Sequence, residues 1–98
     1  MITLHEVEVI HEILIERFGG SNGIRDRNLL ESAINRPYQG FGHQELYPGA
    51  IDKAAAIFES IIKNHPFQDG NKRTAYVLMR LLLNEDNLDI HASEDDEV

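Results

Sequence analysis

The stretch from His65 to Arg73 holds the side chains with the clearest chemical potential in this 98-residue chain. Gly70 can turn the backbone sharply, so that several amides at the start of a following helix point at one spot. Unpaired first-turn N–H groups favour anions, and Lys72 and Arg73 add two positive charges there. Cations in a first turn oppose the helix dipole by about 0.3–1 kcal/mol each, and a bound phosphate would reverse that penalty. We therefore predict a phosphate site formed by Gly70, Asn71, Lys72 and Arg73.

Two further side chains of this stretch suit a transfer reaction beside a phosphate. Asp69 is a hard oxygen ligand that could hold Mg²⁺ against phosphate oxygens, and its alternative role is to cap the following helix. His65 carries an imidazole, which can accept the proton of a hydroxyl near neutral pH. Together with the anion site, these residues predict His65 as a general base and Asp69 as a metal ligand.

Two His-Glu pairs near the N-terminus, His5-Glu6 and His11-Glu12, look like fragments of a zinc motif. Neither pair is followed by a histidine at the required spacing, and residues six positions apart lie on different faces of a helix. We therefore expect surface histidines. The chain has no cysteine, which excludes thiolate chemistry and a disulfide framework.

The segments that must position these groups have mainly helical patterns. Thr3 and Glu6 form a capping box, and a Gly-Gly pair follows the first apolar stripe. The stretch 64–70 is flanked by two strongly apolar segments, which we expect to be buried helices. The fold class is all-α with about four helices, predicted at 4–18, from Asp26 to just before Pro37, at 51–63 and at 71–84.

The connection 36–49 has no helical period and is rich in proline and glycine. It predicts a loop or a small hairpin before the central helix. Three aromatic residues, Tyr38, Phe41 and Tyr47, exceed the needs of a polar linker. They either pin the connection to the core or belong to a flap that faces a substrate.

The C-terminal part predicts a short extended piece at 88–92 and then an acidic segment at 93–98. Ser93 could cap a further helix, and acids follow it as in a first helical turn. Either this is the start of a truncated helix, which leaves an apolar groove open, or the acidic tail has no fixed structure. We divide the chain into one domain at 1–92 and this tail at 93–98.

Composition fits one small globular unit, because 42% of the residues are hydrophobic. The net charge of −8 is concentrated in residues 85–98, which carry seven acids and no Lys or Arg. The remaining residues are nearly neutral and hold no long basic stripe, so we do not expect direct DNA binding. No apolar run is long enough for a membrane span or a secretory signal, which favours a cytoplasmic protein.

The run His65-Pro66-Phe67-x-Asp69-Gly70-Asn71-Lys72-Arg73 resembles the signature of the Fic/Doc superfamily, and its lysine resembles the Doc (death-on-curing) branch. Further similar runs are Gly19-Gly20, 23–26, 29–33, Arg36-Pro37, 46–48 and 53–55. The resemblance implies a Fic-like helical bundle and transfer of a phosphate-containing group from a nucleotide such as ATP to a protein hydroxyl. It implies His65 as base, Asp69 as Mg²⁺ ligand, the segment 70–73 as phosphate cradle, and a target-docking flap with Phe41, Leu46 and Tyr47.

Two positions bear on the branch. Adenylylating Fic proteins usually have glycine in place of Lys72 and a second arginine in place of Tyr76, whereas Doc-type proteins move the γ-phosphoryl group. The leading hypothesis is a toxin of a toxin-antitoxin system that phosphorylates a Ser or Thr of a protein target and inhibits translation, with EF-Tu as family precedent. The alternatives are an AMP-transferase, a truncated module that binds nucleotide or antitoxin, and a structural helical subunit.

The resemblance also implies a partner. Doc proteins commonly pair with a Phd-like antitoxin, whose tail folds as a helix onto the toxin and blocks the site. The sequence leaves a homo-oligomer open.

Overall fold

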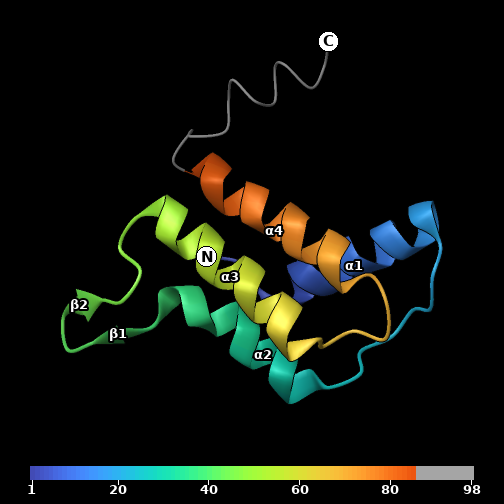
Figure 1. The fold of residues 1–98 in the computed structure, drawn as a ribbon, viewed down its shortest axis with the longest axis horizontal. Coiled ribbons are helices and arrows are strands. Elements are labelled where there is room, and N and C mark those ends of the chain that lie inside the picture. Colours follow the sequence, from blue (N-terminus) through green and yellow to red (C-terminus); the bar gives the residue numbers. More distant parts are fainter. Residues whose placement is uncertain (86–98) are drawn as a thin grey trace, which may run out of the picture.

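Four α-helices and one small hairpin make up residues 1–85, the part of the chain that the computed structural model describes (Figure 1). In chain order they are α1 (Leu4–Phe18), α2 (Arg27–Asn35), a 3₁₀ turn (Arg36–Tyr38), β1 (Gly40–Phe41), β2 (Gln44–Glu45), α3 (Ala50–Asn64) and α4 (Asn71–Glu85). The all-α prediction is confirmed. The extended piece predicted at 88–92 and the acidic segment 93–98 lie outside the described residues.

The helix ends follow local signals. The Thr3 hydroxyl accepts a hydrogen bond from the Glu6 N–H at 3.2 Å, and the Glu6 carboxylate accepts one from the Thr3 N–H at 2.9 Å. These bonds lower the pKa of Glu6 and confirm the predicted capping box. Asp26 caps α2 through the Leu29 N–H at 3.0 Å. Pro37 falls in the 3₁₀ turn, where a helix stops.

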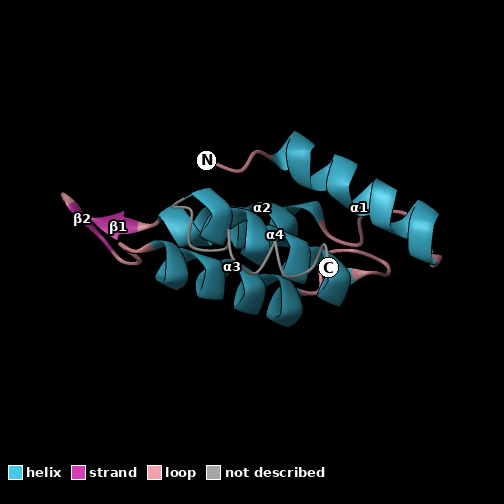
Figure 2. Cartoon of the chain, turned by 90° about the horizontal axis from the view of Figure 1, so that it is seen from above, coloured by secondary structure: helices cyan, strands magenta, loops and turns pink. Residues whose placement is uncertain are grey.

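The helices pack in two layers. α3 and α4 run side by side in opposite directions and form the most extensive helix pair, with α2 against α3 (Figure 1). α1 lies across one side of this group and contacts α4 (Figure 2). The short 65–70 connection between α3 and α4 therefore lies next to the end of α1 and the start of α2.

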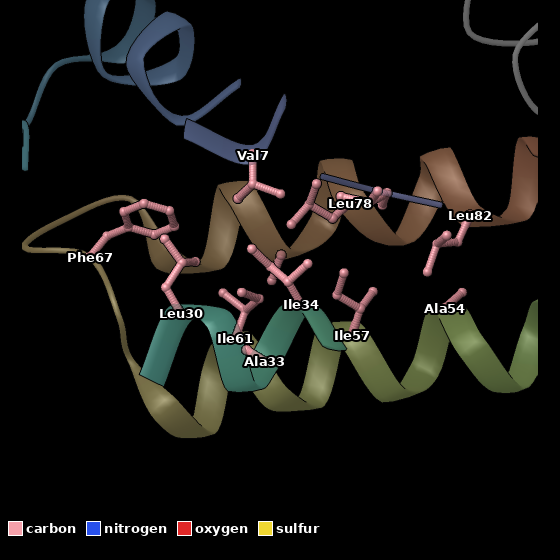
Figure 3. Close-up of a cluster of buried hydrophobic side chains, with 12 residues drawn as sticks. Val7, Leu30, Ala33, Ile34, Ala54, Ile57, Ile61, Phe67, Leu78 and Leu82 are labelled. Atoms are coloured by element: carbon pink, nitrogen blue, oxygen red, sulfur yellow. The ribbon is translucent and has the colours of Figure 1, made fainter. Parts of the chain in front are cut away.

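The core lies mainly between α4 on one side and α2 and α3 on the other, and Val7 of α1 reaches it (Figure 3). Fully buried aliphatic side chains from every helix meet there (Figure 3), among them Val7, Leu30, Ile57, Ile61, Leu78 and Leu82. Phe67 joins the cluster from the α3–α4 connection and is also fully buried. Burying one such aromatic ring stabilises the fold by roughly 1.5–3 kcal/mol, so the core itself anchors the connection.

One of the two histidines of α1 is buried, contrary to the expectation of surface histidines. His11 is only 2% exposed, so the prediction of a surface position was wrong for this histidine, whereas His5 is exposed. Val7 and His11 are the two buried residues of the helix, and Phe18 at its end is exposed. Val7 joins the core, whereas His11 contacts Phe67 and Asp69 of the α3–α4 connection.

The predicted hairpin is present in the connection before α3. Gly40 pairs with Glu45 and Phe41 with Gln44 in an antiparallel ladder. None of the helices within residues 1–85 combines the length and apolarity needed to cross a bilayer.

Candidate active site

The α3–α4 connection begins with a strained residue. His65 ends α3 in the left-handed region, with φ 50° and ψ 55°, and is the one non-glycine residue with positive φ within 1–85. The Arg25 guanidinium donates to the carbonyl oxygens of His65 at 2.7 Å and Asn64 at 2.9 Å. A cation at the carboxyl end of a helix complements its dipole. Arg25 thus holds the backbone of His65, while the imidazole of His65 stays exposed.

Residues 23–26, just before α2, pair with the α3–α4 connection as a short strand would. The Pro66 carbonyl accepts the N–H groups of Arg25 at 2.7 Å and Asp26 at 3.0 Å, and the Gln68 N–H donates to the Gly23 carbonyl at 3.1 Å. An isolated antiparallel bridge joins Ile24 and Phe67. The connection is therefore fixed by main-chain bonds to a segment about forty residues earlier in the chain.

Asn71 closes the connection from the other side. Its side-chain oxygen accepts the Phe67 N–H at 2.9 Å, and its side-chain amide donates to the Phe67 carbonyl at 3.0 Å. The residue is 5% exposed. One side-chain N–H of Asn71 is therefore used inside the fold, while the residue also borders the cavity described below.

Asp69 is exposed and oriented by two backbone amides. Its Oδ1 accepts the Gly70 N–H at 2.9 Å, and its Oδ2 accepts the Ser21 N–H at 3.2 Å. Neither donor belongs to α4, so the alternative role as a cap of that helix is not the one adopted. Asp69 can lie this close to the chain at Gly20 because that residue has no side chain: a Cβ atom there would lie 2.7 Å from Asp69 Oδ2.

The amino end of α4 presents cations. The Thr74 N–H donates to the Gly70 carbonyl at 3.0 Å and is the first amide to close a helical turn. The amides of the three preceding residues have no acceptor within the described part of the chain. Lys72 and Arg73 are exposed there, and the Arg73 guanidinium lies 4.2 Å from the centroid of the Phe18 ring. Free amides, a helix dipole and two cations thus act together at one place.

These groups border one cavity of about 770 Å³. Its polar wall holds every residue that the sequence placed in the catalytic, phosphate and metal sites, together with Gln68, which the sequence did not indicate: His65, Gln68, Asp69, Gly70, Asn71, Lys72 and Arg73. Its apolar wall is formed by Leu14, Phe18, Phe58, Tyr76 and Val77. A concave site of this size, with polar groups on one wall, suits a ligand as large as a nucleotide.

The predicted flap residues are not brought to this cavity. The hairpin precedes the amino end of α3, and His65 follows the carboxyl end, about 22 Å away along the helix (Figures 1 and 2). Phe41 is 89% exposed and Leu46 is also exposed. Tyr47 accepts a hydrogen bond from Arg36 at 3.1 Å, a contact that raises the pKa of Arg36. Tyr47 therefore pins the connection, and target docking by the three residues stays a prediction.

The donor set at the cavity suits Mg²⁺ only when the ligand brings further oxygens. Asp69 is the single carboxylate on its wall, and residues 1–85 contain no group of three His, Asp or Glu side chains that could hold a metal ion. Mg²⁺ commonly binds one or two carboxylates together with substrate phosphates. Asp69, beside the groups that are predicted to bind phosphate, fits that pattern.

Comparison with known proteins identifies the family of this chain. Residues 1–83 match the pattern of the Fic/DOC family. Toxin Doc of Mycolicibacterium smegmatis is 38% identical over 78 residues, which are 80% of this chain and 60% of Toxin Doc. Protein kinase doc of Escherichia phage P1 is 27% identical over 92 residues, which are 94% of this chain and 72% of that protein. No solved structure gives a significant match.

The chain therefore belongs to the Fic/DOC family. Within the family it belongs to the Doc branch, to which both relatives belong by name. The chain spans about 60% of the length of Toxin Doc.

The left-handed conformation of His65 predicts a more stable glycine variant. The conformation costs a residue with a Cβ atom about 1–2 kcal/mol, and the extra freedom of glycine in the unfolded chain offsets about 0.4–1 kcal/mol. We expect His65→Gly to raise the free energy of unfolding, measured in urea, by about 0.5–1 kcal/mol. Gln68→Gly, in the same connection but without positive φ, is the control. Equal destabilisation by both changes would contradict this account.

The contact between Gly20 and Asp69 predicts a difference between two neighbouring glycines. Both Gly19 and Gly20 have positive φ, so an alanine is strained at either position. A Cβ at Gly19 meets nothing within 4 Å, whereas one at Gly20 displaces Asp69. We expect Gly20→Ala to be less stable than Gly19→Ala by about 1 kcal/mol, the value of one lost hydrogen bond. Superimposable urea transitions for the two variants would show that Asp69 is not held there.

Proposed function

We propose that this protein transfers the γ-phosphoryl group of ATP to a Ser or Thr hydroxyl of a protein target, as a Doc-type toxin. The observation that carries the proposal is a single cavity bordered by an exposed imidazole, one carboxylate and the cationic amino end of a helix. Such a helix end with two cations suits the phosphates of a nucleotide. The name of the relative from phage P1, Protein kinase doc, supports the same chemistry.

The role of each residue follows from its place on the cavity wall. The phosphates bind the free amides of α4 with Lys72 and Arg73, which stabilise the charge on the transferring group. His65 accepts the proton of the target hydroxyl as the oxygen bonds to the γ-phosphorus. The bond from the γ-phosphorus to the bridging oxygen breaks, and ADP leaves with the electron pair.

Asp69 is the residue that would hold Mg²⁺. When bound there, the cation neutralises charge on the phosphate oxygens. The two amides that bind the Asp69 carboxylate orient it before any ligand arrives.

Lys72 supports γ-phosphoryl transfer over AMP transfer. Its long cationic side chain borders the cavity, and adenylylating Fic proteins usually have glycine at this position. Tyr76 borders the same cavity, at a position where adenylylating Fic proteins usually have a second arginine.

EF-Tu is the family precedent for a target, and a Phd-like antitoxin is the proposed inhibitor. The name Toxin Doc of the mycobacterial relative supports a toxin pair.

Label transfer tests the reaction directly. The purified chain is incubated with a cell lysate and ATP labelled at either the γ- or the α-phosphate. We expect label on protein from the γ-position only, and its loss in His65→Ala, because no other imidazole borders the cavity within residues 1–85. His5→Ala, which removes an exposed imidazole elsewhere, is the matched control. Label from the α-position would instead identify an AMP-transferase, and bound ATP without any transfer would identify a binding module.

The proposed metal role predicts a change in nucleotide binding rather than in fold. We expect Asp69→Asn to weaken ATP binding about tenfold in the presence of Mg²⁺, as loss of a charged ligand does. Calorimetric titration with EDTA in place of Mg²⁺ is the control, and there the two proteins should bind alike. Equal affinity in Mg²⁺ would remove Asp69 from the metal site.

A further inference from the structure

A buried histidine on α1 reaches the backbone of the candidate site. The Nε2 atom of His11 lies 2.7 Å from the carbonyl oxygen of Asp69. A carbonyl oxygen can only accept, so Nε2 carries the proton and donates. The two residues are 58 positions apart in the sequence, and His11 is not on the wall of the large cavity.

The imidazole of His11 is held on two sides. Its ring stacks on Phe67 with a centroid distance of 3.8 Å and an interplanar angle of 7°. On another side it lies against Gly70, where an added Cβ would be 3.6 Å from Nε2 and 3.1 Å from Ile15 Cδ1. A donor fixed in this way determines where its acceptor must point.

The hydrogen bond from His11 sets the plane of the Asp69–Gly70 peptide. In a trans peptide the C=O and N–H groups point in opposite directions. With the oxygen turned toward His11, the Gly70 N–H points away from α1 and meets Asp69 Oδ1 at 2.9 Å. The orientation of the Asp69 carboxylate thus depends on the hydrogen bond that His11 donates to the Asp69 carbonyl oxygen.

We propose that His11 is a positioning residue for the phosphate and metal site, acting through the Asp69–Gly70 peptide. Gly70 has φ 77° but tolerates negative φ equally well, so nothing at that residue prevents the peptide from flipping. A flipped peptide would turn the Asp69 carbonyl oxygen toward the phosphate site and remove the amide that orients the carboxylate. The role of His11 in nucleotide binding rests on the function proposed above, whereas its role in orienting the Asp69–Gly70 peptide does not.

Two substitutions separate the donor from the packing. His11→Phe keeps an aromatic ring that can stack on Phe67 but removes the donor, and His11→Gln keeps an N–H donor but removes the ring. His5→Phe, on the exposed part of α1, is the matched control. Thermal melts establish that each variant folds.

The first measurement needs no nucleotide. In ¹H–¹⁵N spectra we expect the Gly70 amide to shift and to exchange about tenfold faster with solvent in His11→Phe, the scale of one lost hydrogen bond. It should stay close to wild type in His11→Gln and His5→Phe. A Gly70 amide unchanged in His11→Phe would overturn the proposal. So would a wild-type imidazole with its proton on Nδ1 alone, which can be read without any variant.

The second measurement is ATP binding with Mg²⁺. We expect His11→Phe to bind about tenfold more weakly and His11→Gln within about threefold of wild type. The reverse order, with Gln impaired and Phe normal, would assign His11 to packing only and overturn the proposal. If wild-type protein binds no ATP, the proposed function fails, and the Gly70 amide still decides the role of His11.

Discussion

The pairing of residues 23–26 with the α3–α4 connection is the constraint on which the candidate site depends. A connection of six residues between two packed helices can satisfy few of its own backbone N–H and C=O groups. Here Gly23, Arg25 and Asp26 take up its main-chain groups, while Asn71 binds Phe67 from the other end. These hydrogen bonds fix the backbone of the connection from the inside of the fold. The side chains of His65 and Asp69 can therefore face solvent while the segment that carries them stays ordered.

Much of the fold could be predicted because its signals are local. Thr3, Asp26 and Pro37 each mark a helix end through a contact with residues a few positions away. The face that α3 buries was harder to place. Ala55 and Ile62 are apolar residues of this helix that are exposed, while Ile57 is fully buried. In a helix rich in alanine and isoleucine several faces are apolar, and packing against α2 and α4 selects which one is buried.

The candidate site likewise has some features that the sequence predicts and others that depend on the fold. Its solvent-facing members lie within nine consecutive residues, so residue type and spacing were enough to group them. The roles of Asn71, His11 and Arg25 depend on partners chosen by the fold. His11 stands four positions after Val7, which places it on the buried stripe of α1, and this spacing was a usable signal. Nothing local indicates that Arg25 would cap α3 from outside the helix.

The sequence distances within the site have a consequence for how the chain folds. The bonds from His11, Ser21 and Arg25 to the segment 64–69 span 39 to 58 positions, so each closes a long loop. Helices can form early from nearby residues, but such contacts wait until the topology is complete. A nascent chain still emerging from the ribosome would therefore carry the whole nine-residue signature without yet having a working pocket.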